Sequence, residues 1–414
     1  MRRPAVRFAA LASLSTCDTL EFHISTDILA FYPLTLVPDG SDVVVGRRDI
    51  ESYASFPADG AELLRRLRAG SSVVEAGRWY RERYGAAVDM ADFVETLRDL
   101  KFVRSPGDPE TAPVRRPRWQ RLGRVVFSWP AWLLYLGVCG YALVLMVEFP
   151  YLRPSYESFF FTPSLLVMEL GLLLGQLPGI LLHEAMHALA ARRRGVASQM
   201  RIANRFYVLV FETQLNGLWS LPRRHRYLPL LAGMLADLVW CASLVILARL
   251  TNPSGLSYAF PGAFFQALAA STLLRLCWQF YFYLRTDVYE VFVTALRCVD
   301  LHQTTKEYLT NRLHRLRRRP PPHDEDRWHP RDRQVARWYV YMFGLGYLLS
   351  LAMLAWFLIP AMARVLSGIA TRLLTGAEFS ARFVDGCLAF ALNLVPLLIV
   401  AVLVLRRRRA RRPG

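Results

Sequence analysis

The residues best suited to chemistry are His183, Glu184 and His187, which form the pattern His-Glu-x-x-His. Residues four apart lie on one face of an α-helix, about one turn from each other, so both imidazoles can bind the same metal ion. Zinc accepts two imidazoles and leaves positions for a carboxylate and a water molecule. Glu184 follows the first histidine directly, where its carboxylate can take a proton from that water. The pattern therefore predicts a Zn²⁺ site with Glu184 as the general base.

The motif lies in an apolar stretch that should be helical, because residues 181–194 contain no glycine or proline. Two histidines at this spacing can also be ordinary polar residues near the basic end of a membrane helix. Ionisable groups in or near a bilayer are costly to bury and are usually functional, which favours the metal site. Pro178 and Gly179 precede the motif and predict a break or a kink in the helix.

A catalytic zinc site usually has three protein ligands, so the two histidines need a third partner at a similar depth. The spare histidines lie in basic loops, which leaves Asp237 and Asp287 as candidates. Asp287 matches the depth of the motif better, although it could also serve as an interfacial helix cap. Asp237 could instead pair with Arg275, for which Glu169 is a further candidate partner. At the helical rise of about 1.5 Å per residue, Arg275 and Glu169 should lie roughly 20 Å from the site.

The composition indicates a membrane protein with a soluble part, since 54% of the 414 residues are hydrophobic, 20% are charged and the mean hydropathy is +0.23. The net charge is +18, but lysine and arginine gather beside apolar runs, as the positive-inside rule describes for cytoplasmic loops. We therefore expect contact with an anionic inner leaflet and no nucleic-acid partner. Six cysteines have neither metal-binding nor redox spacing, which indicates free thiols and not a disulfide framework.

Apolar runs predict about six transmembrane helices, at residues 125–147, 163–194, 227–250, 263–284, 338–361 and 387–405. Basic segments border these runs so that both termini of a multi-pass cell-membrane protein are cytoplasmic. The second run ends in three arginines, which places the two histidines near the inner face of the membrane. After it, residues 206–213 predict a hairpin or re-entrant segment beside the site, which could hold an extended substrate or serve packing. Residues 361–383 predict an amphipathic outer segment.

The N-terminal part predicts a small soluble unit with strands at residues 28–37 and 42–46 joined by a turn at Pro38-Asp39-Gly40. Capping and stop residues predict three helices and then a short returning strand, at residues 61–67, 72–84, 89–100 and 101–103. This order suggests a winged-helix-like α+β unit that resembles the PqqD-like peptide-recognition domains, which bind a leader peptide as an extra strand.

Two other roles for this unit remain open. A DNA-binding winged helix is disfavoured, because the residues before Ser105 carry about as many acidic as basic side chains. A purely structural cytosolic cap is the second alternative. The first residues are weakly similar to a signal peptide, but their apolar core is short, and we expect no cleavage.

The membrane part resembles the site-2 protease family of intramembrane zinc metalloproteases, in the branch of peptide zinc metalloproteases, over residues 125–300. The family has His-Glu-x-x-His, then Gly-Pro-x-x-Asn or Asp, then Leu-Asp-Gly, and the aspartate of the last motif is its third zinc ligand. Here the second motif corresponds to Gly233-Met234-Leu235-Ala236-Asp237, and the third to Thr286-Asp287-Val288. The resemblance implies Asp287 as the third ligand, although Met234, Thr286 and Val288 depart from the family pattern.

The fold class expected is a polytopic α-helical membrane protein with a small N-terminal cytosolic domain. Residues 1–104 form the PqqD-like domain, 105–124 a linker, 125–300 the zinc metalloprotease membrane core, 301–337 a basic and partly flexible cytoplasmic segment, 338–405 the C-terminal transmembrane helices and 406–414 a basic tail.

The function expected is that of a zinc metalloendopeptidase, a hydrolase that cleaves a peptide or a membrane-associated polypeptide during peptide maturation or export. Glu184 is its catalytic residue, and His183, His187 and Asp287 bind Zn²⁺. The alternative is a membrane receptor or export accessory that holds a modified peptide without cleaving it.

Overall fold

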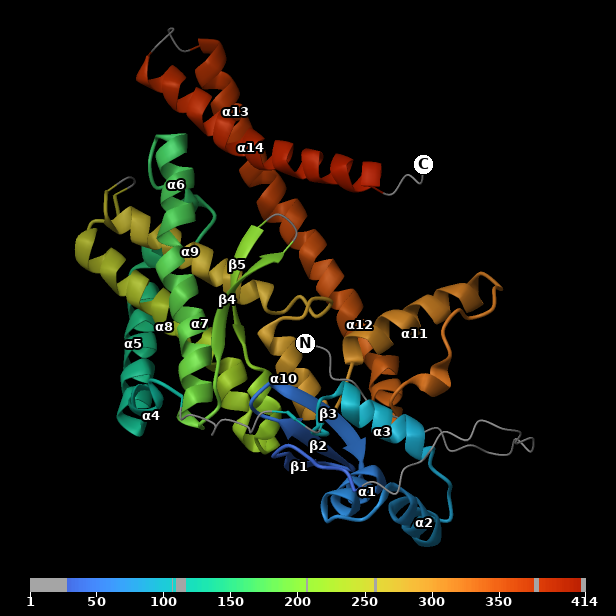
Figure 1. Ribbon diagram of the computed structural model, residues 1–414. Coiled ribbons are helices and arrows are strands. Elements are labelled where there is room, and N and C mark those ends of the chain that lie inside the picture. Colours follow the sequence, from blue (N-terminus) through green and yellow to red (C-terminus); the bar gives the residue numbers. More distant parts are fainter. Residues whose placement is uncertain are drawn as a thin grey trace.

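The computed structural model describes residues 28–105, 107–108, 117–205, 208–256, 259–375 and 380–410. Helices form most of it, with a small sheet at the bottom of Figure 1 and a separate hairpin beside the long helices. The N-terminal stretch that is weakly similar to a signal peptide lies outside the described residues, as do residues 106 and 109–116 of the linker.

The N-terminal domain begins with a three-stranded antiparallel sheet in the order β1 (Thr35–Asp39), β2 (Asp42–Arg47) and β3 (Ser52–Pro57). The predicted turn after β1 is present, and Gly40 adopts a φ of +84° that few other residues tolerate. The third strand was not predicted. Three helices then cover the sheet: α1 (Ala58–Arg68), α2 (Val73–Tyr84) and α3 (Met90–Asp99).

Local capping explains why α2 and α3 begin and end close to where the sequence predicts. The Ser72 side chain accepts from the backbone N–H of Glu75, whose carboxylate accepts from the N–H of Ser72, and Gly85 ends α2 in the left-handed conformation. Asp89 caps α3. The predicted returning strand is reduced to a single bridge between Phe31 and Val103.

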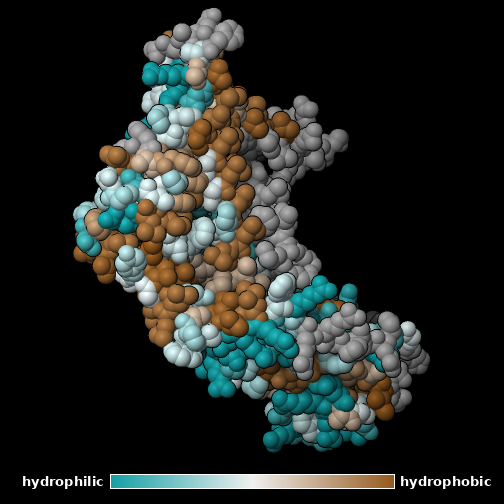
Figure 2. Space-filling model, turned by 90° about the vertical axis from the view of Figure 1, so that its left-hand side faces the viewer, coloured by the Kyte–Doolittle hydropathy of each residue, from teal (hydrophilic) through white to brown (hydrophobic). Residues whose placement is uncertain are grey.

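The apolar part is a set of packed helices. They are α4 (Gln120–Val126), α5 (Trp129–Glu148), α6 (Leu165–Gly175), α7 (Leu177–Arg193), α8 (Tyr227–Thr251), α9 (Gly262–Trp278), α12 (Pro330–Met353), α13 (Ile359–Thr375) and α14 (Ala381–Ala410). Among the described residues, four stretches are long and apolar enough to cross a membrane: Trp129–Glu148, Leu165–Arg193, Arg223–Thr251 and Pro330–Leu374. Figure 2 shows the hydrophobic surface over these helices and hydrophilic surface at the bottom, over the N-terminal domain.

Three segments differ from the sequence-based expectation. The fourth predicted span, α9, ends at Trp278, and the chain then turns back toward α10 (Asp287–Leu296). The basic segment at residues 301–337 contains a helix that was not predicted, α11 (Leu301–Leu316). The predicted outer segment, residues 361–383, is not separated from the preceding helix. Helix α12 continues without a gap through a π-helical turn at Leu354–Leu358 into α13.

The predicted hairpin beside the site is present as β4 (Gln199–Arg205) and β5 (Val208–Gln214), paired antiparallel. It lies next to α7 in Figure 1. Short 3-10 helices complete the chain, at Pro150–Leu152, Glu157–Phe159, Asn216–Ser220, Arg223–His225 and Glu325–Arg327.

Helix α8 lies at the centre of the apolar part, between α7 and α9. Small side chains allow the close approach of α7 and α8, because Ala232 and Ala236 of α8 pack against Met186 and Ala190 of α7. This packing brings α7, which carries His183 and His187, against α8, which carries Asp237.

Candidate metal centre

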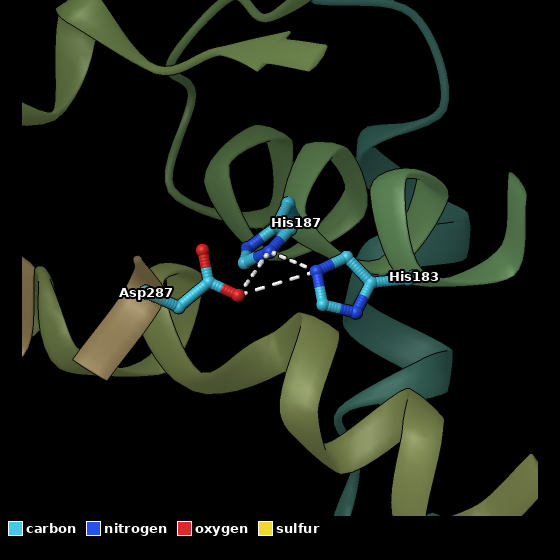
Figure 3. Close-up of side chains that lie close together, drawn as sticks. All are labelled: His183, His187 and Asp287. Atoms are coloured by element: carbon cyan, nitrogen blue, oxygen red, sulfur yellow. Dashed lines mark hydrogen bonds and ion pairs between the residues drawn. The ribbon is translucent and has the colours of Figure 1, made fainter. Parts of the chain in front are cut away.

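The side chains of His183, His187 and Asp287 converge as the sequence predicted. Asp287 Oδ2 lies 3.2 Å from Nε2 of His183 and 3.3 Å from Nε2 of His187. The two Nε2 atoms are 3.1 Å apart. Figure 3 shows the carboxylate facing both rings. One ligand atom from each residue lies within 4.8 Å of the other two, so the three residues could hold one metal ion.

Breaks in two helices place these ligands. Helix α6 ends before Gln176, and α7 starts afresh with Pro178 in its first turn, where a missing N–H costs nothing. The predicted break therefore lies just before Pro178. His183 and His187 follow on one face of α7.

Asp287 is held at the first residue of α10. Thr286 caps this helix by accepting from the N–H of Tyr289, and its hydroxyl donates to the carbonyl of Gln279 at 2.8 Å. The N–H of Asp287 donates to Gln279 Oε1 at 3.0 Å. The threonine that departs from the family pattern thus has a clear structural role, because it anchors the ligand-bearing turn.

Each imidazole is oriented from behind by an acceptor. His187 Nδ1 lies 2.7 Å from the carbonyl oxygen of Pro229, which can only accept, so the proton of this ring is on Nδ1. His183 Nδ1 lies 3.0 Å from Asp237 Oδ2, which favours the same tautomer. Both Nε2 lone pairs are then free, and such partners orient and strengthen metal-binding histidines.

Three electron-rich atoms therefore point at one another with no proton among them. Asp287 Oδ2 is buried and accepts no hydrogen bond from the described residues. This arrangement is repulsive without a cation and fits a divalent metal ion, which identifies Asp287 and not Asp237 as the third candidate ligand.

Asp237 has a different partner set, which includes the predicted pair with Arg275. Arg275 Nη2 and Nε donate to its carboxylate at 2.5 and 3.2 Å, and Nη1 donates to Gln176 Oε1 at 3.0 Å. The expected separation of roughly 20 Å from the site is wrong for Arg275, because α9 ends at Trp278 and the chain folds back. Glu169 is not its partner but accepts from Asn393 at 2.8 Å.

Gly233 forms the floor of the site. A Cβ atom at this position would lie 2.3 Å from His187 Nε2 and 2.4 Å from His183 Nε2. Gly233 lies four residues before Asp237, one helical turn away, so both face α7. The sequence indicates Gly233 only as part of the segment that ends in Asp237. The four-residue spacing between the two, which places both on the face of α8 toward α7, was the available signal for the close approach to the imidazoles.

Glu184 does not join the three ligands but contacts the hairpin. Its Oε2 accepts from the N–H of Thr213 at 2.8 Å, and its backbone carbonyl accepts from the Thr213 hydroxyl at 3.1 Å. Strand β5 thus fixes the glutamate that follows the first candidate ligand. Thr213 and Gln279 are site residues that the sequence did not reveal. Thr213 reaches Glu184 across 29 residues, and Gln279 reaches Thr286 and Asp287 because the chain turns back after α9.

Replacing Asp237 with asparagine should weaken zinc binding by about 10- to 100-fold, as is usual when the partner of a ligand histidine is lost. The neutral amide orients His183 less strongly and leaves Arg275 without its counter-charge. Competition with a chromophoric chelator measures the affinity. Glu169→Gln, a carboxylate in the same candidate span as the motif, is the control and should bind zinc normally. Equal affinities for both variants would contradict a role for Asp237.

Comparisons with models of protein families, with curated proteins and with solved structures find no match for this chain. Any function therefore has to be argued from the geometry of the site itself. That geometry defines a candidate divalent-metal centre inside a bundle of apolar helices.

Proposed function

We propose that this chain is a membrane-embedded zinc metallopeptidase of the site-2 protease type. The observation that carries the proposal is the convergence of two Nε2 atoms and one carboxylate oxygen, with both Nδ1 atoms already committed to acceptors. Two histidines and one carboxylate are the ligand set of several catalytic zinc sites, which leave a further position for water or substrate.

In this proposal the chain supplies both positioning and proton transfer. Zinc held at the site would acidify a water molecule and polarise the scissile carbonyl. Glu184 takes the proton from that water and later delivers it to the leaving amine. Thr213 keeps the glutamate beside His183 through the two hydrogen bonds described above. The apolar surroundings limit access of bulk water, which strengthens the electrostatic interactions inside.

The substrate in this proposal is a peptide or a membrane-associated polypeptide. Strand β5 contacts Glu184, which supports an extended substrate held near the hairpin. The small sheet of the N-terminal domain has two edge strands, β1 and β3, which supports a PqqD-like, winged-helix-type recognition of a leader peptide. We further propose the six-span topology in a cell membrane, with both termini cytoplasmic, from the distribution of basic residues.

The alternative, a zinc-bound receptor or export accessory, is favoured by one observation. The Glu184 carboxylate already accepts a hydrogen bond from the backbone N–H of Thr213, so one of its oxygens is engaged by the protein itself. Such a protein would bind metal and peptide but leave the peptide intact.

Removal of the metal tests the enzyme against the receptor. The full chain in detergent, incubated with β-casein, should produce fragments that disappear with 1,10-phenanthroline and return when zinc is added. The 1,7-isomer, which does not chelate, is the matched control and should have no effect. Mass spectrometry of the casein and elemental analysis of the protein provide the measurements. Bound zinc with intact casein would favour the receptor, and a protein without metal would refute both.

A further inference from the structure

The N-terminal domain is joined to the membrane part by a buried ion pair. Asp39, at the end of β1, accepts from Arg226 Nη1 at 3.0 Å and also pairs with Arg223. The side chains of Asp39 and Arg226 are only 6% and 1% exposed. A charge buried to this degree is costly unless an opposite charge accompanies it. The contact is therefore a built part of the structure.

The surroundings of Arg226 extend this contact. Its Nε donates to the carbonyl of Leu221 at 2.8 Å, and its guanidinium carbon lies 5.1 Å from the centre of the Trp219 ring. Trp219 packs in turn against Val44 and Tyr53 of the small sheet. The sheet thus contacts the segment before α8 through both a charge pair and an apolar cluster, at the bottom of Figure 1.

A short path leads from this contact to the metal centre. Arg226 immediately precedes α8, and its carbonyl accepts from the N–H of Leu230 in the first turn. Pro229 in the same turn supplies the carbonyl that orients His187. Gly233, which touches both imidazoles, follows one turn later. Whatever fixes Arg226 therefore fixes the part of α8 that contacts the ligands.

We infer that Asp39 is a positioning residue for the metal centre, acting through Arg226 and the first turn of α8 on the orientation of His187. The inference rests on the metal-binding part of the proposed function. The N-terminal domain then helps to orient His187 although it supplies no ligand atom, in addition to any role in binding substrate.

A second contact between the same two parts provides a matched control. Asp42, at the start of β2, accepts a hydrogen bond from His329 Nε2 at 3.1 Å. His329 caps α12 and does not lead to α8. Asp39 and Asp42 both belong to the turn region between β1 and β2, so Asp39→Asn and Asp42→Asn each remove one carboxylate charge from the same interface.

The test compares these two variants and Asp39→Glu in the full chain in detergent. Two quantities are measured: zinc affinity by chelator competition, and hydrogen exchange of the backbone amides at residues 230–236 in metal-free protein. Asp39→Asn should weaken zinc binding by about tenfold or more and speed exchange in the first turns of α8. Asp42→Asn should match the unchanged protein in both, and Asp39→Glu should restore part of each.

Two outcomes would overturn the inference: Asp39→Asn behaving like Asp42→Asn, or both variants changing the two measurements equally. Unchanged exchange within α1–α3 shows that the N-terminal domain itself is still folded. If the unchanged chain binds no zinc, the proposed function fails, while the exchange comparison still decides whether Asp39 fixes α8.

Discussion

Replacing Glu184 with glutamine should leave the zinc content unchanged and lower peptide hydrolysis by about 100- to 10,000-fold, the usual contribution of a general acid–base residue. Glutamine has the same shape and can still accept from Thr213, so the local fold should persist. It cannot take a proton from water, because an amide is not basic. Elemental analysis and the rate of casein cleavage measure the two effects separately.

Two further variants serve as controls for Glu184→Gln: one removes a metal ligand, and the other removes a carboxylate away from the site. His183→Ala should lose zinc and activity together, because one of the three ligands is gone. Glu148→Gln, at the exposed end of α5, should keep both. Full turnover by Glu184→Gln would end the general-base assignment, whereas loss of zinc in that variant would mean that the glutamate supports the metal centre directly.

Replacing Gly233 with alanine should abolish zinc binding altogether. The added methyl group would lie within 2.5 Å of three imidazole atoms, where van der Waals contact requires much more space. The rings would have to rotate away from Asp287, or α8 would have to move away from α7, and overpacking of this kind costs about 1–3 kcal/mol or more. Metal content after purification, together with thermal unfolding in detergent, measures the loss.

Gly137→Ala is the matched control for this prediction. Gly137 also lies in an apolar helix, α5, but a Cβ atom there would meet nothing within 4 Å. Because alanine favours helices more than glycine does, that variant should bind zinc normally and unfold at an equal or higher temperature. Zinc bound at the normal ratio by Gly233→Ala would show that the rings lie farther from α8 than described.

The sequence identified the three candidate ligands because each depends on local pattern. The spacing of His183 and His187 follows from helix geometry, and Asp287 follows from its place after an apolar run. The position of Arg275 was wrong because depth was counted along an unbroken helix, and Gln279 begins a turn instead. A count along one helix cannot detect a chain that reverses.

The strands show the same limit. Capping residues fixed α2 and α3, since the hydrogen bonds involved are made within a few residues. Strand β3 was missed because Ser52–Pro57 has no strong alternation, and pairing with β2 and burial under α1 select it. The contact of Thr213 with Glu184 spans 29 residues and could not be predicted from either segment alone.

The unbroken rod formed by α12, its π-helical turn and α13 has a consequence for how the molecule meets lipid. It covers 45 residues, Pro330–Leu374, which corresponds to about 68 Å at the usual helical rise. A hydrocarbon layer is about 30 Å thick, so a helix of this length that crossed such a layer would extend outside it over more than half its length or tilt steeply. Near its N-terminal end the helix carries the buried Asp332, which accepts from the N–H groups of Val299 and Asp300. One continuous helical run thus connects the residues packed around α11 to α13 at its far end.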